Sequence, residues 1–319
     1  MRVLVTGVTG FVGHHLTAHL QSLGHEVHGL ARADAGEALP PGVPAHRADI
    51  RDPAGVTAAF ASARPDAVVH LAGASSVGRS FADPRGTWEV NLTGTLNVLE
   101  ALRAQPAPPR CLVVTSGEIH GRVPLAALPV REGTPLDPVS PYGASKAAAD
   151  LAASQYAHAY GLPVVRVRAF NHVGPGQDAR FVIPNVARQL ARAEAEGRTE
   201  VEIRVGNVDT RRDFTDVRDM VRAYGLLLAA GRPEHPYLAC TGRSVAVRDL
   251  VEQLAAQARL DARVVSDPGL VRSGEQPDLY GEPRRLRDEL GWTPAIPLST
   301  TLADSLEWWR ARIAHGEDQ

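Results

Sequence analysis

The chain of 319 residues has few cysteines, few aromatic residues and no strong excess of charge of either sign. A formal net charge of -2 at pH 7 gives no field that would attract nucleic acid or an anionic membrane, so any phosphate must be bound by local sites. No apolar run approaches the roughly 18 residues of a membrane helix. The strand-like residues 2–5 directly after Met1 leave no room for a signal peptide. We therefore expect a cytoplasmic protein that binds small molecules.

The two cysteines, Cys111 and Cys240, lie far apart, each in or beside a strand-like run, and neither has the spacing of a metal ligand. We predict reduced core residues and no metal site. Lysine is rarer still: of 34 basic residues only Lys146 is a lysine, and the other 33 are arginines. A lysine that persists among so many arginines indicates a task for a compact point charge, which a guanidinium cannot perform.

Lys146 lies in the segment Tyr142-Gly143-Ala144-Ser145-Lys146. On a helix, residues four apart share one face, so the ammonium would lie near the phenol. We expect this charge to lower the pKa of Tyr142 from about 10, so that the tyrosine exchanges protons near neutral pH. The alternative is an ordinary surface lysine after an ordinary turn.

The first half of the chain alternates short apolar runs with amphipathic stretches, which predicts an α/β fold with a doubly wound parallel sheet of the Rossmann type. The predicted strands are 3–5, 26–31, a short third strand that ends at Asp49-Ile50, 67–71, 111–115 and 164–168. The helical patterns between them are 11–23, 53–63, 87–104 and 142–160. Beyond residue 170 proline, glycine and arginine are denser, with helical patterns at 181–196, 216–230 and 246–258. We predict a dinucleotide-binding domain formed by 1–168, 211–242 and 277–291, and a smaller α/β substrate-binding domain formed by 169–210, 243–276 and 292–319.

A glycine-rich turn, Gly7-Val8-Thr9-Gly10-Phe11-Val12-Gly13, follows the first predicted strand and opens a helix. Gly7 permits a tight turn, Gly10 lets backbone amides approach a pyrophosphate, and Gly13 lets the helix pack closely on the sheet. Such a turn is also common in plain loops, but here the strand before it and the helix after it favour dinucleotide binding. The predicted site includes Thr9, Phe11 and Val12.

The ends of the next strands refine this prediction. An NAD-specific site usually has a carboxylate after the second strand, whereas this chain has Arg32, which favours the ribose phosphate of NADP(H) and leaves NAD(H) possible. The alternative for Arg32 is a solvated loop arginine, since Arg47 and Arg51 show how freely arginine occurs here. Asp49 and Ile50 are predicted to contact the adenine, or else to form a turn or helix cap. Small residues after the fourth strand let the backbone pass close to the cofactor; the predicted residues are Leu71, Ala72 and Gly73.

Ser116 ends the fifth predicted strand, where a parallel sheet faces its ligand, and Glu118 follows it. Together with Tyr142 and Lys146, Ser116 forms a set in the order found in the extended short-chain dehydrogenase/reductase superfamily, also known as the NAD-dependent epimerase/dehydratase family, which the chain resembles over its full length. This resemblance implies catalytic roles for Ser116, Tyr142, Lys146 and Glu118.

The second half is similar to the branch of that superfamily that handles GDP-linked 6-deoxyhexoses, on the segments 170–177, 205–207, 211–219 and 272–277. The similarity is greatest to reductases of GDP-4-keto-6-deoxy-mannose and next to GDP-mannose 4,6-dehydratases. The resemblance implies a GDP-linked sugar as the binding partner, with Arg212 and Arg272 on the diphosphate and Glu275 on the ribose. Its implied substrate residues are Ser75, Ser76, Ser116, Glu118, Asn171, Arg180, Val182, Asn207, Arg212, Arg272 and Glu275.

The residue after Ser116 bears on the reaction. Family dehydratases have a serine or aspartate and then a glutamate after the active hydroxyl residue, and this chain has Gly117 and Glu118. Because Gly117 has no side chain to assist the departure of water, we predict NADPH-dependent reduction of the 4-keto group to a GDP-6-deoxyhexose such as GDP-rhamnose. The alternatives are a dehydratase, a nucleotide-sugar 4-epimerase, or a non-catalytic nucleotide-binding protein. Helices 87–104 and 142–160 resemble the pair through which relatives dimerise; Leu92, Leu96 and Leu99 would serve that interface or an internal core.

Overall fold

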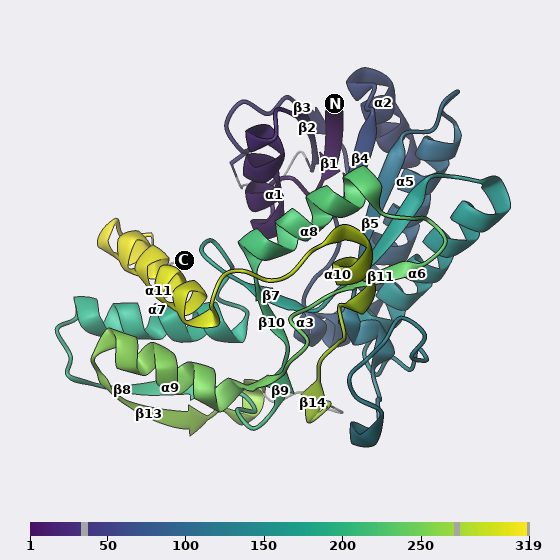
Figure 1. Cartoon of the computed structure of the whole chain (residues 1–319). Helices are drawn as coiled ribbons and strands as arrows, with labels where there is room; N and C mark the ends of the chain where they lie inside the picture. The colour runs from purple at the N-terminus through teal and green to yellow at the C-terminus, as the bar shows by residue number, and fades with distance from the viewer. Residues whose placement is uncertain (33–37, 271–274, 318–319) are drawn as a thin grey trace.

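The computed structural model of the chain describes residues 1–32, 38–270 and 275–317. Its centre is a seven-stranded parallel sheet with the order β11-β6-β5-β4-β1-β2-β3 (Figure 1). The predicted doubly wound sheet is thereby confirmed, with β11 as a strand that the sequence did not reveal. The strands are β1 (Arg2–Thr6), β2 (Glu26–Ala31), β3 (Ala45–Arg47), β4 (Ala67–His70), β5 (Arg110–Ser116), β6 (Val164–Ala169) and β11 (Pro236–Ala239).

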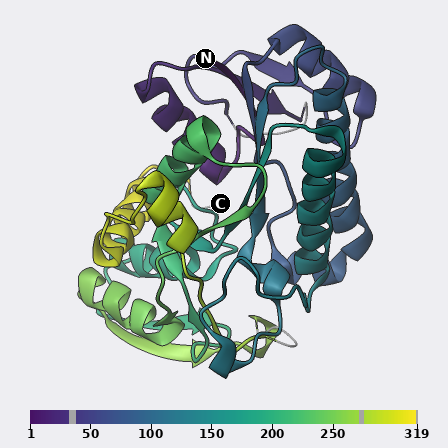
Figure 2. The same ribbon diagram turned by 45° about the vertical axis from the view of Figure 1, so that its right-hand side comes forward.

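Successive strand residues point to opposite faces of the sheet, and both faces are covered by helices. Val3 and Val5 belong to the core under α1 (Phe11–Ser22) and α8 (Val217–Ala230). Leu4, between them, belongs to the core under α2 (Pro53–Ala63), α5 (Gly94–Arg103) and α6 (Pro141–Tyr160). The two layers lie on opposite sides of the sheet (Figure 2). Cys111 and Cys240 are buried with free thiols, as expected of core residues.

Local signals fix the start of α6, which is the helix that carries the predicted catalytic residues Tyr142 and Lys146. The Ser140 side chain accepts a hydrogen bond from the backbone N–H of Gly143 at 3.0 Å, and Pro141 occupies the first helical position. The helix ends at Gly161, whose φ of 64° suits the left-handed conformation that glycine adopts easily. Tyr142 therefore lies in the first turn of α6 and Lys146 one turn later.

The predicted helix 87–104 is interrupted. The short helix α4 (Pro84–Trp88) is followed by a π-helical turn, η1 (Glu89–Thr93), and α5 begins at Gly94. The single residue that such a turn adds rotates the side chains on either side of it, and π-turns occur often at functional sites. The hydrophobic spacing predicted helix here but could not show this turn, because it shifts the pattern by only one residue.

The second half adds a smaller lobe below the sheet (Figure 1). Its core lies between three helices and a parallel strand pair, and Val173 and Phe214 of two short strands also contribute. Besides β6, β11 and α8, the elements of the second half are β7 (Asn171–Val173), α7 (Val182–Ala195), β8 (Glu200–Val205), β9 (Arg211–Arg212), β10 (Phe214–Asp216), β12 (Val245–Ala246), α9 (Val247–Ala258), β13 (Asp261–Ser266), β14 (Asp278–Leu279), α10 (Arg284–Leu290) and α11 (Leu298–Ala314). Of these, α10 packs through Leu286 in the core under α1 and α8. Among the described residues, no helix is both long and apolar enough to span a bilayer.

Candidate active site

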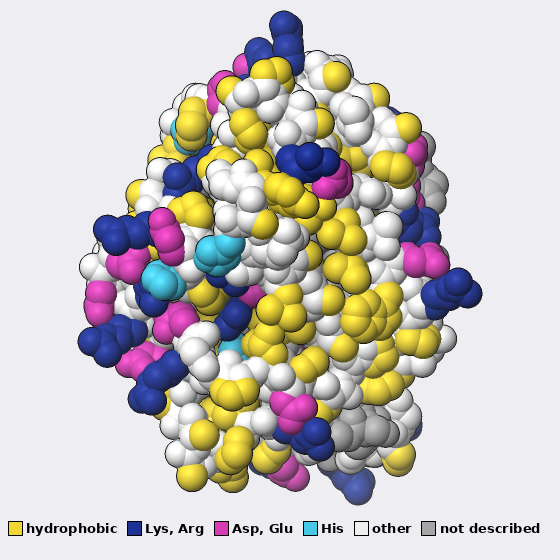
Figure 3. Space-filling view, turned by 90° about the vertical axis from the view of Figure 1, so that its right-hand side faces the viewer, with side chains coloured by type: hydrophobic (Ala, Val, Ile, Leu, Met, Phe, Trp, Pro, Cys, Tyr) yellow, Lys and Arg dark blue, Asp and Glu magenta, His cyan; other side chains and the backbone are white. Residues whose placement is uncertain are grey.

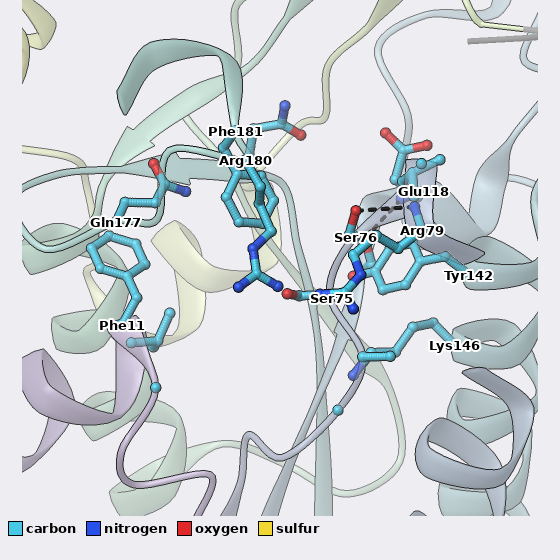
Figure 4. A pocket seen from close by; sticks show the side chains of 18 of the residues that line it. Phe11, Ser75, Ser76, Arg79, Glu118, Tyr142, Lys146, Gln177, Arg180 and Phe181 are labelled. Atoms are coloured by element: carbon cyan, nitrogen blue, oxygen red, sulfur yellow. Dashed lines mark hydrogen bonds between the residues drawn. The ribbon is translucent and has the colours of Figure 1, made fainter. Parts of the chain in front are cut away.

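A cavity of about 1520 Å³ lies between the sheet and the smaller lobe and takes its walls from both (Figure 4). Every predicted site residue that the structure describes lines this one cavity, whereas Arg272 lies outside the described residues. The predicted residues that line it are Gly7, Thr9, Gly10, Phe11, Val12, Gly13, Arg32, Asp49, Ile50, Leu71, Ala72, Gly73, Ser75, Ser76, Ser116, Glu118, Tyr142, Lys146, Asn171, Arg180, Val182, Asn207, Arg212 and Glu275.

The glycine turn has the close backbone approach that a dinucleotide site needs. Gly7 has a φ of 70°, and a Cβ atom there would lie 2.8 Å from the backbone nitrogen of Ala72. A Cβ atom on Gly13 would lie 2.4 Å from the carbonyl oxygen of Val8. Gly10 caps α1 without a side-chain hydrogen bond, so the first amides of this helix have no intrahelical acceptor and lie at the cavity. This helix end fits a diphosphate.

Arginines gather at the far end of this turn, where the adenosine of a dinucleotide would lie. Arg32 is exposed at the cavity rim, and the Arg47 guanidinium donates to its carbonyl oxygen at 3.0 Å. Arg51 binds the Asp49 carboxylate, with Nη2 to Oδ2 at 2.7 Å, and holds the pKa of that carboxyl below its usual value. The backbone N–H of Arg51 also donates to Asp49, so Asp49 has the turn role given above as the alternative.

The four predicted catalytic residues line the cavity at the carboxyl end of β5: Ser116, Glu118, Tyr142 and Lys146. Figure 4 shows the side chains of Glu118, Tyr142 and Lys146 on this wall. Ser116 lies beside the Tyr142 phenol and favours its ionised form, which lowers the pKa of the phenol. The ammonium of Lys146 donates to the carbonyl oxygen of Val114 at 3.2 Å. Gly73 makes this position possible, since a Cβ atom there would lie 3.0 Å from the Lys146 nitrogen. The lone lysine is therefore half-buried in the cavity wall, one helix turn after the tyrosine.

The electrostatics differ from the sequence prediction. Burial raises the pKa of Tyr142 to about 12; the neighbouring Ser116 lowers it, and the nearby charge of Glu118 raises it further. Burial also lowers the pKa of Lys146 to about 8. The expected lowering of the tyrosine pKa is wrong, because the loss of solvent outweighs the groups that favour tyrosinate. At neutral pH Tyr142 is a protonated phenol, which can give a proton, and Lys146 remains mostly cationic.

Asn91, which the sequence analysis missed, ties the catalytic helix to the cofactor loop. It lies in the π-helical turn, where its Oδ1 accepts from the backbone N–H of Ala74 at 2.8 Å. Its Nδ2 donates to the Ser145 hydroxyl at 2.9 Å, and that hydroxyl donates to the carbonyl oxygen of Tyr142 at 2.8 Å. The only available signal was a polar residue within an apolar helical pattern, three residues before Gly94.

His70 extends this network to the first strand. Its ring nitrogens lie 2.8 Å from the Thr6 hydroxyl and 3.0 Å from the Thr95 hydroxyl, and Thr95 donates to the carbonyl oxygen of Asn91 at 2.6 Å. Burial and, to a smaller extent, the charge of Lys146 together lower the pKa of His70 to about 3. His70 is therefore a neutral bridge that leaves Lys146 as the cation of this corner.

On the substrate side, the two groups predicted for phosphate and ribose contact each other. Arg212 is buried, and its Nη2 lies 3.6 Å from Glu275. Arg180 forms an ion pair with Asp178. Two further predicted groups make local turns: Asn207 accepts from the backbone N–H of Asp209, and Ser76 caps the short helix α3 (Val77–Ala82). These polar groups line the cavity on the side of the smaller lobe.

The wall next to Ser116 is apolar and closed. A Cβ atom on Gly117 would lie 3.0 Å from the ring of Phe170, which is tighter than ordinary contact. On its other side the same ring is 2.7 Å from where a Cβ atom of Gly281 would lie. Phe170 is buried among Val130 and Leu238, so it has little space into which to move. A side chain at position 117 would therefore press on the ring of Phe170, and glycine avoids this contact.

Comparison with known proteins shows the family to which this chain belongs. The sequence model described as GDP-mannose 4,6 dehydratase matches residues 4–305. The chain belongs to this family. The predicted resemblance to nucleotide-sugar enzymes of the extended short-chain dehydrogenase/reductase type is thereby confirmed.

Relatives of this chain are named for different reactions. GDP-6-deoxy-D-mannose reductase from Pseudomonas aeruginosa is 40% identical, with 98% of each chain covered. GDP-mannose 4,6-dehydratase from Yersinia enterocolitica is 27% identical, with 95% of this chain and 92% of that protein covered. Among solved structures, RMD from Pseudomonas aeruginosa complexed with NADPH superimposes with a TM-score of 0.85 at 39% identity, covering 98% of this chain and 99% of the other.

Proposed function

We propose that this protein is an NADPH-dependent reductase that converts the 4-keto group of GDP-4-keto-6-deoxy-mannose to the alcohol of a GDP-6-deoxyhexose such as GDP-rhamnose. The observation that carries the choice of reaction is the packing of Phe170 against Gly117, which disfavours the additional acid of a dehydratase at this position. The 40% identity to a GDP-6-deoxy-D-mannose reductase over the whole chain supports the same reaction.

The catalytic residues fit proton donation to a ketone. When bound, NADPH supplies the hydride to carbon 4. Tyr142, protonated at neutral pH, gives its hydroxyl proton to the ketone oxygen, and Ser116 donates a hydrogen bond to the same oxygen as negative charge develops. Lys146 then stabilises the tyrosinate that remains. Glu118 raises the pKa of Tyr142, so it helps to keep the phenol protonated until the proton is transferred.

The fit to a dinucleotide is argued from the glycine turn, whose backbone approach at Gly7 and open amides at the start of α1 suit a diphosphate. Arg32 at the rim, with Arg47 and Arg51 close by, favours the additional phosphate of NADP(H). NAD(H) is the alternative cofactor; a UDP-glucose 4-epimerase structure from Thermus thermophilus in complex with NAD has a TM-score of 0.88 at 33% identity.

For the substrate, we propose that the smaller lobe binds the GDP moiety and presents the hexose to Tyr142. Arg212 would part from Glu275 to contact the diphosphate, and Glu275 would contact the ribose. We keep the proposed division into a dinucleotide-binding domain of 1–168, 211–242 and 277–291 and a substrate domain made of the other segments. We also propose that the protein is cytoplasmic and forms a homodimer through α5 and α6.

Replacement of Tyr142 by Phe tests the proposal directly. We expect the turnover of GDP-4-keto-6-deoxy-mannose with NADPH to fall by about 10²–10⁴-fold, because the proton donor is lost. NADPH affinity, measured by fluorescence titration, should change by less than about threefold, because the diphosphate site is intact. A variant with full turnover would remove Tyr142 from the catalytic role.

The second candidate is GDP-mannose 4,6-dehydratase, favoured by the family model and by the retention of Glu118. This reaction would consume GDP-mannose in the presence of NADP⁺ and release a 4-keto-6-deoxy sugar and water. Incubation of the purified protein with GDP-mannose, followed by mass spectrometry for a loss of 18 mass units, separates the two. Appearance of that product would replace the reductase proposal by the dehydratase.

A further inference from the structure

The ring of Phe11 connects the cofactor turn to the loop of residues 171–177, here called the substrate loop. Phe11 is the first residue of α1, and its ring lies parallel to that of His172, with centroids 6.2 Å apart and planes 8° apart. The backbone of the loop follows the ring closely, since Cβ atoms on Gly174 and Gly176 would each lie 3.9 Å from Phe11. The loop thus packs against a side chain that the glycine turn supplies, and Figure 4 shows Gln177 of this loop next to Phe11.

His15, one turn further along α1, makes a second connection. Its Nε2 lies 2.8 Å from the carbonyl oxygen of Pro175. A carbonyl oxygen only accepts, so the hydrogen is on Nε2 of His15. Burial lowers the pKa of His15, which favours the neutral ring that this bond uses. The His15 ring also meets the edge of Phe11, with centroids 5.4 Å apart and planes at 82°. Phe11 therefore lies between a histidine of its own helix and a histidine of the loop.

The loop has few other supports near its tip. At its base, Asn171 to Val173 pair with β10. Within the loop, the Gln177 side chain donates to the carbonyl oxygen of His172 at 3.0 Å. Gly174 packs on Val217 at the start of α8. At the tip, the carbonyl oxygen of Pro175 and the backbone of Gly176 both contact α1. Asn171 and Gln177 at the two ends of this loop line the cavity, so the position of the loop decides where they meet a ligand.

We propose that Phe11 and His15 are positioning residues that couple dinucleotide binding to nucleotide-sugar binding, by holding the substrate loop against the first turn of α1. This inference rests on the proposed function, since it takes NADPH and a GDP-linked sugar as the two ligands. A diphosphate on the first amides of α1 fixes that turn, and with it the ring of Phe11 and the bond of His15 to Pro175. The second ligand then meets a loop that is already ordered, so its binding costs less conformational entropy. The coupling is reciprocal: each ligand strengthens the binding of the other by the same factor.

Isothermal calorimetry of GDP binding, with and without saturating NADPH, measures this factor without turnover. For the wild type we expect NADPH to strengthen GDP binding by about fivefold or more. His15→Ala removes the bond to Pro175, and we expect the factor to fall to within about twofold of unity while NADPH alone binds nearly as before. His15→Gln keeps an N–H donor at a similar reach and should restore part of the factor. This restoration separates a specific bond from a general loss of packing.

His14→Ala is the matched control, because His14 is the neighbour of His15 on α1 and has no side-chain hydrogen bond within the described part of the chain. It should keep the wild-type factor. A wild-type factor of one, or a factor retained in His15→Ala, would overturn the coupling. Assay of ketone reduction keeps the two proposals distinct: coupling without turnover would refute the reductase alone, and turnover without coupling would refute this inference alone.

Discussion

At the scale of single residues, the proposed role of Lys146 predicts a pH limit on catalysis. Burial brings its pKa to about 8, whereas burial of Tyr142 raises the phenol pKa to about 12. Between pH 6 and 10 the phenol therefore stays protonated, and Lys146 is the group that changes charge. Lysine is cationic below its pKa. The charge proposed to stabilise the tyrosinate that remains after proton transfer is therefore present at pH 7 and is lost as the pH rises through about 8.

We predict that kcat/KM for ketone reduction is flat below about pH 7 and falls about tenfold for each pH unit well above 8. The measurement is a pH profile of initial rates with saturating NADPH. Lys146→Arg supplies the control, because a guanidinium does not titrate in this range: its activity should be low but without the fall near pH 8. The same fall in the arginine variant would assign the titration to another group.

At the scale of elements, the π-helical turn between α4 and α5 has a mechanical role. It places Asn91 where three hydrogen bonds join Ala74 of the cofactor loop to Ser145 of the catalytic helix. A regular helix through 87–104 would rotate Asn91 away from at least one of these partners, since each residue advances an α-helix by about 100°. The turn therefore belongs to the hydrogen-bond network that positions Tyr142 relative to the cofactor loop.

Asn91→Leu should lower the free energy of unfolding by about 2–3 kcal/mol, because buried backbone and hydroxyl groups lose their partners. We also expect kcat to fall by about tenfold or more, since Ser145 no longer fixes the first turn of α6. Asn97→Ala is the control: it removes a bond of 2.8 Å from α5 to the carbonyl oxygen of Ile50, away from Tyr142. Urea unfolding and single-turnover rates should show that both variants lose stability and only Asn91→Leu loses kcat. Equal kcat in the two variants would reduce Asn91 to a structural residue.

The elements also show why sequence reasoning reached some features and missed others. Hydrophobic periodicity located β1 and α6 to within a residue or two, because apolar spacing and caps such as Ser140 are local signals. The π-turn and His70 depend on contacts between segments distant in sequence, which leave no periodic pattern. The sign of the Tyr142 shift was missed for a related reason: the proximity of Lys146 can be read from spacing, whereas the degree of burial cannot.

At the scale of the whole molecule, the cavity is made by chain segments that cross between the two lobes. Residues 171–177 leave the sheet after β6, and 211–217 return to it through β10 and α8. The motifs in these segments marked the substrate region from the sequence. Their pairing did not follow from it, as the contact between Arg212 and Glu275 shows: two groups assigned to different parts of a ligand meet each other across the lobe.

The outer face of α5 and α6 exposes large apolar side chains. Figure 3 looks onto the side of the molecule where these helices lie and shows hydrophobic side chains gathered across it. On α6, Leu151 is 60% exposed and Tyr160 is 52% exposed. Leu99, which was considered for this surface, is buried in the core under α5, whereas Leu92 and Leu96 are half-buried. Exposed apolar area of this kind is typical of an interface, and a second copy of the chain would cover it.

We predict that the wild-type protein is a dimer by sedimentation velocity and that Leu151→Glu weakens dimerisation by at least about 30-fold, because a carboxylate would be buried in an apolar contact. Leu125→Glu is the matched control, since Leu125 is 62% exposed but lies in the loop before the cis Leu128–Pro129 bond, away from α5 and α6. It should remain dimeric. A monomeric wild type, or a dimer that Leu151→Glu leaves intact, would place the hydrophobic face of α6 outside any interface between copies of this chain.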